Sequence, residues 1–353
     1  MESFKKLFLI KNHSELSINN AKKGDGIIII LSYPDTVVRP AYREFSSKIW
    51  HKIGIGNKHA VQAGHAALLL IKKDNPEIKY FDFGRYITSD GNGRVRSSET
   101  DNELYIPLKA SYKNNTLTNL ENILFWIERH PEKTHGSGRL IASVNYNIDY
   151  DKALKFINDL INQKEIPYGA FIKKATNCAR FVTDTIIAST TKKKIKLHLK
   201  NSKLFTPSPI GNVIKANTTD KIYEVINQKT TLYKNRSVVK EYKVFLNKRL
   251  DVKLNLIGTE LPDLNSFSLE KGTWLGGIGS GAWFHIEAQI DSKNYTIARY
   301  TSQGIKDFEG IFLINLTSFK IDEKYQFTYP TNCKEMFVLQ NGQEYILKIN
   351  TFN

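Results

Sequence analysis

The N-terminal part of the chain alternates short apolar runs with turns and amphipathic segments. Residues 27–31 are Ile-Ile-Ile-Ile-Leu, an unbroken run that predicts a strand buried on both faces. We expect a second strand over residues 62–71 and a third, with strict alternation, over residues 79–86. The segment 74–77, Asp-Asn-Pro-Glu, separates the second and third strands. Its turn-forming residues predict an antiparallel hairpin.

Three later segments have the apolar spacing of helices. The first covers residues 117–130 and the second residues 150–163. The third begins at Cys178, where the preceding Asn177 is a favourable N-cap residue. Its expected buried stripe consists of Phe181, Val182, Thr185 and Ile186. The first 215 residues therefore combine strands and helices in one α+β unit.

The pattern changes after about residue 221, where short strand-like runs and turns dominate. These runs cover residues 238–246, 254–258, 281–289, 295–300, 310–316, 335–339 and 344–349. Asn341-Gly342 is a strong hairpin signal. The glycine-rich run 276–281 precedes no helix, so we interpret it as a tight bend rather than a phosphate loop. We expect residues 216–353 to form an all-β domain, a sandwich or a barrel.

Composition adds a strong positive charge to an otherwise ordinary globular profile. Hydrophobic residues make up 41% and charged residues 24% of the chain. The net charge of +16 and the pI of about 9.5 favour contact with anionic surfaces such as lipid head groups, a cell-wall polymer or nucleic acid. We interpret the densest cluster, Lys192 to Lys200, as a solvated face. No zinc-finger spacing or RNP-like motif supports a specific nucleic-acid contact.

The two cysteines differ in their sequence surroundings. Cys178 lies in the first turn of a predicted helix, where free N–H groups and the helix dipole favour a thiolate. Cys333 lies in a polar turn with no evident base. The two lie in different expected domains, so we predict no disulfide framework. A nucleophilic Cys178 is one interpretation, and a buried structural thiol is the other.

A histidine and a carboxylate are expected beside each other on the hairpin. His65 lies near the start of the second strand and Asp82 lies in the third. Adjacent antiparallel strands bring these side chains together if the register permits. Such a pair suits a Cys–His site in which a polar residue orients the imidazole. Tyr80 is the alternative to Asp82 as that third member.

These motifs resemble the NlpC/P60 superfamily of papain-like cysteine hydrolases. The resemblance covers roughly residues 20–190 and rests on the strands beginning at Gly24-Asp25 and Gly64-His65, on Tyr80 to Phe83, and on Asn177 to Val182. His65 precedes Cys178, which is the order of the circularly permuted branch, including lecithin:retinol acyltransferase-like enzymes. The resemblance implies a permuted fold, an antiparallel sheet with packed helices.

The resemblance also implies roles for individual residues. Cys178 would be the nucleophile, His65 the base and Asp82 the orienting residue. Tyr168, in the segment Pro167-Tyr168-Gly169, would contribute to oxyanion or substrate binding. The implied reaction is amide hydrolysis through an acyl-enzyme, with a cell-wall peptide as one substrate class. No metal or cofactor is implied.

Two other functions remain open from the sequence. The same site could act on a lipid or thioester acyl group at an anionic membrane, as a hydrolase or acyltransferase. Alternatively, the fold could be an inactive papain-like scaffold that binds a partner. The N-terminal apolar run is too short for a secretory signal, and no stretch approaches the length of a membrane span. We therefore expect a cytoplasmic protein or one exported without such a signal. The sequence leaves the oligomeric state open.

Overall fold

The computed structural model describes two regions of the chain. These are residues 24–234 apart from 42, 45–48, 50, 55 and 115, and residues 259–352 apart from 266, together with the single residue 237. The expected strands at 238–246 and 254–258 lie outside the described residues. No helix in the described part of the chain is both long and apolar enough to cross a membrane.

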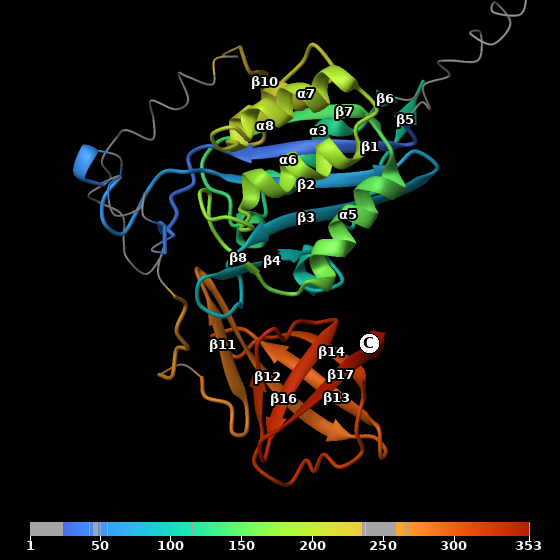
Figure 1. Ribbon diagram of the computed structural model, residues 1–353. Coiled ribbons are helices and arrows are strands. Elements are labelled where there is room, and N and C mark those ends of the chain that lie inside the picture. The colour runs from blue at the N-terminus through green and yellow to red at the C-terminus, as the bar shows by residue number, and fades with distance from the viewer. Residues whose placement is uncertain are drawn as a thin grey trace, which may run out of the picture.

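One large antiparallel sheet forms the centre of the N-terminal domain (Figure 1). Its strands are, in spatial order, β10 (Lys229–Leu232), β9 (Tyr223–Ile226), β7 (Leu140–Ile148), β1 (Gly26–Tyr33), β2 (His65–Lys72), β3 (Asn75–Gly84), β4 (Asn92–Arg96) and β8 (Ile166–Pro167). Every residue of β1 is buried, which confirms the prediction of a strand covered on both faces. The hairpin of β2 and β3 forms as the sequence predicts.

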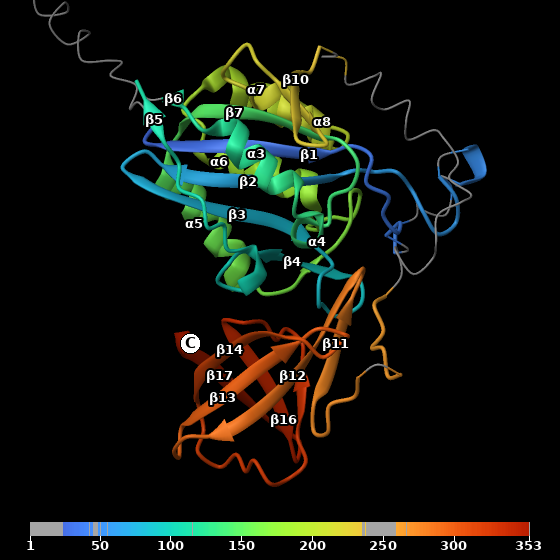
Figure 2. The ribbon, with the colours of Figure 1, turned by 180° about the vertical axis from the view of Figure 1, so that it is seen from behind.

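Helices cover both faces of this sheet. One face carries α5 (Tyr150–Asn162), α6 (Cys178–Ser189), α7 (Lys193–Ser202) and α8 (Pro209–Ala216). The opposite face, seen in Figure 2, carries α3 (Leu120–Glu128) and α4 (Pro131–Thr134). Alternate residues of β1 supply the two cores: Ile28 and Ile30 face the first helical layer, and Ile27 and Ile29 face the second.

Several short elements complete this domain. Two 3-10 turns cover His51–Ile53 and Asn102–Leu104, and a small hairpin pairs β5 (Tyr112–Lys113) with β6 (Thr116–Leu117). The basic run that we interpreted as a solvated face is the helix α7, which buries Ile195 and Leu199 and leaves most of its lysines exposed.

The N-terminal domain extends beyond the expected boundary at residue 215. Strand β9 pairs with the outer edge of β7, and β10 pairs with β9. Val225 packs into the core beneath α3, so β9 gains its burial from this domain. The boundary that we expected between residues 215 and 216 is therefore too early, and the chain belongs to the first sheet as far as Leu232.

The C-terminal domain is all-β and barrel-like, as expected for a sandwich or barrel. Its sheet order is β11 (Thr273–Gly277), β12 (Ser280–Gln289), β13 (Asn294–Tyr300), β14 (Lys306–Ile314), β17 (Gln343–Phe352), β16 (Glu335–Gln340) and β15 (Gln326–Thr328). The sheet curls so that its two edge strands meet, where the Phe327 N–H donates to Thr273 Oγ1 at 3.0 Å. An aromatic core that includes Phe284 and Phe312 fills the interior.

The two domains contact each other along the β4 and β8 side of the first sheet (Figure 1). Arg299 of β13 contacts Glu103 at 2.5 Å across this interface. The tight bend predicted for the glycine-rich run is the turn of the β11–β12 hairpin. A Cβ atom on Gly277 would lie 2.3 Å from Ile87 N and 2.4 Å from Arg85 O, so glycine permits this close approach.

Candidate active site

Cys178 is the first residue of α6, as the sequence predicts. Asn177 caps the helix, because its side-chain Oδ1 accepts from the Arg180 N–H at 2.9 Å. The cysteine is 8% exposed and packs at the edge of the core between α6 and the sheet. Its thiol therefore lies at a helix N-terminus, where unpaired N–H groups and the dipole favour negative charge.

Arg180 holds the loop that leads into α6. Its Nη1 donates to the carbonyl oxygen of Ala175 at 2.8 Å, and its Nη2 donates to that of Ala170. The buried carboxylate of Glu44 accepts from the Phe171 N–H at 3.0 Å. These contacts fix the chain on the N-terminal side of Cys178, and the sequence offered no pattern that linked Glu44 to this loop.

His65 and Asp82 are in contact at the start of β2. The β2–β3 register pairs Ala67 with Asp82, so His65 is the diagonal neighbour of Asp82 on the same face. The His65 Nε2 lies 3.3 Å from Asp82 Oδ2. Tyr80, the alternative third member, donates its hydroxyl to Asp82 Oδ2 at 2.9 Å. The carboxylate therefore contacts the imidazole, and the tyrosine supports the carboxylate.

Asp82 is fully buried and paired with a buried arginine. Arg96 donates from Nε to Oδ1 at 3.0 Å and from Nη2 to Oδ2 at 2.6 Å. Burial raises the pKa of Asp82, but the charge of Arg96 and hydrogen bonds from His65 and Arg96 outweigh it, and the pKa falls well below its usual range. Asp82 is therefore an ionised carboxylate facing His65.

Arg96 is a site residue that the sequence reasoning missed. It lies on β4, which contains the sequence Gly-Arg-Val-Arg. The alternation is the overlooked signal: Val95 enters the helical core on one face, whereas Arg94 and Arg96 point to the other. Arg94 forms its own buried pair with Asp101 at 2.5 Å.

His65 also interacts with Cys178. Burial lowers the pKa of His65, but hydrogen bonds with Asp82 and Cys178, together with their charges, outweigh it and raise the pKa to about 9. The structure thus places His65 in contact with Asp82 and within electrostatic reach of Cys178, and the raised pKa means that the imidazole holds its proton at neutral pH.

Tyr168 packs against the core cluster that contains Cys178. It follows β8, its ring stacks on Phe83 with centroids 6.1 Å apart, and the Arg85 Cζ lies 4.4 Å from its centroid. Burial raises the pKa of Tyr168, the charge of Cys178 raises it further, and Arg85 lowers it. The net shift is upward, so the phenol keeps its proton and can donate a hydrogen bond.

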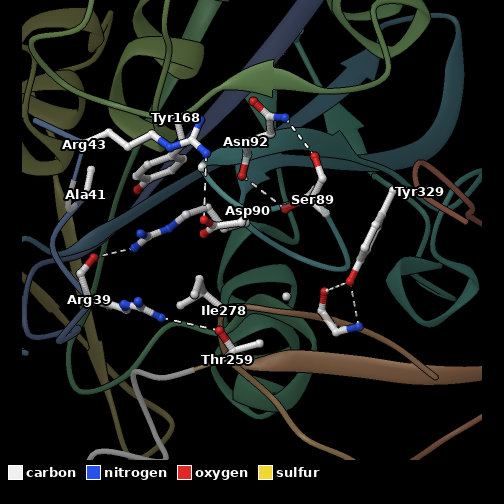
Figure 3. A pocket seen from close by; sticks show the side chains of 15 residues that line it. Arg39, Ala41, Arg43, Ser89, Asp90, Asn92, Tyr168, Thr259, Ile278 and Tyr329 are labelled. Atoms are coloured by element: carbon white, nitrogen blue, oxygen red, sulfur yellow. Dashed lines mark hydrogen bonds and ion pairs between the residues drawn. The ribbon is translucent and has the colours of Figure 1, made fainter.

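A cavity of about 230 Å³ is lined in part by Tyr168 (Figure 3). The N-terminal domain contributes Arg39, Arg85 and Tyr168, and the C-terminal domain contributes the hairpin turn at 276–278 and Tyr329. The Tyr329 hydroxyl donates to the carbonyl of Gly276 at 2.6 Å. Within the described residues, no group of three or more His, Cys, Asp and Glu side chains could hold a metal ion.

The fold and the site together define a mixed α/β domain that carries a Cys–His–carboxylate series, joined to a β-barrel-like domain. Residues 28–195 match the model of a protein family described as type VI secretion system effector TseH-like. Residues 272–350 match a second family, described as the DUF6695 C-terminal domain. The first match contains His65, Asp82, Tyr168 and Cys178, and the second lies within the barrel-like domain.

A solved structure is also similar to this chain. It is the crystal structure of the type VI secretion system effector TseH, with 16% sequence identity and a TM-score of 0.38. The similarity covers 60% of this chain and 99% of that one. A search of curated proteins found no match to this sequence.

Proposed function

We propose that this protein is a thiol hydrolase that cleaves an amide bond through an acyl-enzyme on Cys178. The observation that carries the proposal is the series Cys178–His65–Asp82, with the thiol at a helix N-terminus and the carboxylate 3.3 Å from the imidazole. His65 precedes Cys178 in the chain, which supports a circularly permuted papain-like fold of the NlpC/P60 type.

In the first step, the Cys178 thiolate attacks the carbonyl carbon of the amide, and the carbonyl oxygen becomes an oxyanion. The N–H groups at the start of α6 and the Tyr168 hydroxyl stabilise this charge. The C–N bond then breaks, and protonated His65 gives its proton to the departing amine. The acyl group remains attached to the sulfur as a thioester.

In the second step, the neutral His65 takes a proton from water, and the resulting hydroxide attacks the thioester carbonyl. The C–S bond breaks, the carboxylic acid product leaves, and the thiolate–imidazolium pair is restored. Asp82 keeps its negative charge throughout and orients the imidazole through Nε2. Arg96 and Tyr80 hold the carboxylate in place and are positioning residues.

The substrate class that we propose is a peptide of the bacterial cell wall. In this proposal the protein is a secreted effector that reaches that wall. The match of residues 28–195 to TseH-like effectors supports an effector role. The net charge of +16 supports attraction to an anionic cell-wall polymer. Cell-wall stem peptides contain the amide bonds that the site would cleave.

The test is incubation of the full chain with purified peptidoglycan and with its soluble muropeptides, followed by mass spectrometry of the products. We expect new amine and carboxyl ends with the wild type and with Cys333→Ala, and none with Cys178→Ala. Release of an acyl group from a lipid or thioester substrate, without amide cleavage, would move the substrate to the acyl-hydrolase class. Absence of any turnover, together with an unreactive Cys178, would support a binding scaffold and overturn the proposal.

A further inference from the structure

The cavity beside Tyr168 has a wall from each domain. Arg39 and Arg85 come from the N-terminal domain, and the β11–β12 turn comes from the C-terminal domain (Figure 3). The Ile278 N–H donates to the Arg85 carbonyl at 2.6 Å, and Arg39 Nη1 donates to Thr259 Oγ1 at 3.4 Å. The cavity is therefore built by both domains. Its volume is about 230 Å³.

The cavity carries positive charge that no carboxylate among the described residues neutralises. Among the described side chains, no carboxylate lies within 4.0 Å of the guanidinium of Arg39 or of Arg85. Arg85 instead lies against the Tyr168 ring and donates to the Arg39 carbonyl. Burial lowers the pKa of Arg85, which is the effect of removing a cation from water without a charged partner.

The other polar groups of the cavity already have partners. Asp90, the acidic residue in its lining, lies 3.8 Å from Arg43 at an exposed position. Ser89 donates to Glu165 Oε2 at 2.5 Å, and Asn92 donates to Ser89 Oγ at 2.8 Å. Asp90 pairs with Arg43, so Arg39 and Arg85 are the lining cations that no described carboxylate contacts.

Tyr168 connects the cavity to the proposed nucleophile. Its side chain lines the cavity, and the same side chain packs against the core cluster that contains Cys178. A substrate acylating Cys178 would therefore have part of its structure within reach of the two arginines. Guanidinium groups bind carboxylates strongly through charge-assisted hydrogen bonds.

From this geometry we infer that the cavity is a carboxylate subsite, and that the substrate is a peptide with a free carboxylate close to the scissile amide. Arg39 and Arg85 bind the carboxylate, and the C-terminal domain closes the subsite through its 276–278 turn. This inference rests on the proposed function, because it assumes that the substrate reacts at Cys178. It gives the C-terminal domain a direct role in substrate selection.

The test uses two alkylating reagents of equal size, bromoacetyl-β-alanine and its carboxamide. Both react with thiols at the same carbon, and they differ by one negative charge. We expect wild-type Cys178 to react faster with the carboxylate reagent. In Arg39→Gln the rate with this reagent should fall about fivefold or more, while the carboxamide rate stays within about twofold. Arg129→Gln, directly after α3 at the far side of the sheet, is the matched control and should leave both rates unchanged.

Gly277→Ala tests the contribution of the C-terminal domain. The added methyl group would collide with the Arg85 carbonyl and move the turn away from the cavity. We expect the preference for the carboxylate reagent to decrease while circular dichroism stays unchanged. Equal preference in the wild type, Arg39→Gln and Gly277→Ala, with Cys178 still reactive, would overturn the subsite and leave the proposed function standing. A wild-type Cys178 that reacts with neither reagent would overturn both.

Discussion

The two cysteines of this chain lie in opposite chemical environments. Cys178 begins a helix, is 8% exposed and interacts with His65. Cys333 is 0% exposed, and burial raises its pKa to about 12 despite the nearby charge of Arg299. Its backbone N–H donates to the Thr100 carbonyl at 2.9 Å across the domain interface. Both thiols have a cationic neighbour, so the imidazole beside Cys178 and the complete burial of Cys333 are the features that distinguish them.

The imidazole is the feature that most separates the two thiols, and removing it should have the largest effect. In His65→Gln we expect the rate of amide hydrolysis to fall by about 10²–10⁴-fold, because the proton donor and acceptor is lost. Alkylation of Cys178 should also slow, because the imidazolium no longer stabilises the thiolate. The measurement is turnover combined with iodoacetamide kinetics at pH 7. An unchanged alkylation rate in this variant would mean that His65 does not activate Cys178.

The buried ion pair behind the imidazole should control stability. In Arg96→Met, Asp82 keeps its charge in a fully buried position without its main partner, and we expect a loss of about 3–5 kcal/mol in the free energy of unfolding. Lys155→Ala breaks the exposed pair with Asp159 and should cost less than about 1 kcal/mol. Urea denaturation measures both. Equal losses in the two variants would contradict a structural role for the Arg96–Asp82 pair.

The identity of the third site residue can be decided by two conservative substitutions. Asp82→Asn keeps the size of the side chain but removes the charge facing His65, and we expect kcat to fall on the order of 10²-fold. Tyr80→Phe removes a hydroxyl that contacts only the carboxylate in this group, so its effect on kcat should be about tenfold or less. A larger loss in Tyr80→Phe would restore Tyr80 as the orienting residue.

The raised pKa of His65 predicts a specific pH dependence. His65 is protonated below a pKa of about 9, so hydrolysis should decline as pH rises through about 9, where the proton for the leaving amine is lost. Because the folded-state pKa is above the unfolded value of about 6.5, the stabilisation is complete below pH 6.5 and disappears towards pH 9. We expect this stabilisation to contribute at most about 3 kcal/mol to the free energy of unfolding, measured by denaturation at pH 6.5 and at pH 9.

His65→Gln is the control for this pH dependence, and its stability should vary less over the same range. In Cys178→Ala, histidine NMR titration should give a lower pKa for His65, because the hydrogen bond and charge of Cys178 both raise it in the wild type. An unchanged His65 pKa in Cys178→Ala would mean that the two residues do not interact.

The local parts of this architecture could be predicted from the sequence. The Asn177 cap depends on residues next to the helix that it begins. The contact between His65 and Asp82 follows from a hairpin of adjacent strands, whose pairing is set by the two-residue connection Lys73-Asp74. Both features arise from interactions over short distances along the chain.

The non-local parts could not be predicted in the same way. Arg96 contacts Asp82 from β4, which lies outside the β2–β3 hairpin. The hydrophobic periodicity of the sequence does not predict which strand pairs with β3. Strand β9 pairs with β7, about 80 residues earlier in the chain, which placed the domain boundary beyond residue 215. The cavity needs side chains from both domains, so its existence depended on their packing.

The most direct test of the central claim is to map iodoacetamide modification of the native protein at both thiols by peptide mass spectrometry. We predict rapid modification of Cys178 and none of Cys333 in the folded wild type, with the Cys178 rate strongly reduced in His65→Gln. Modification of Cys333 ahead of Cys178, or a Cys178 rate that His65→Gln leaves unchanged, would contradict the account.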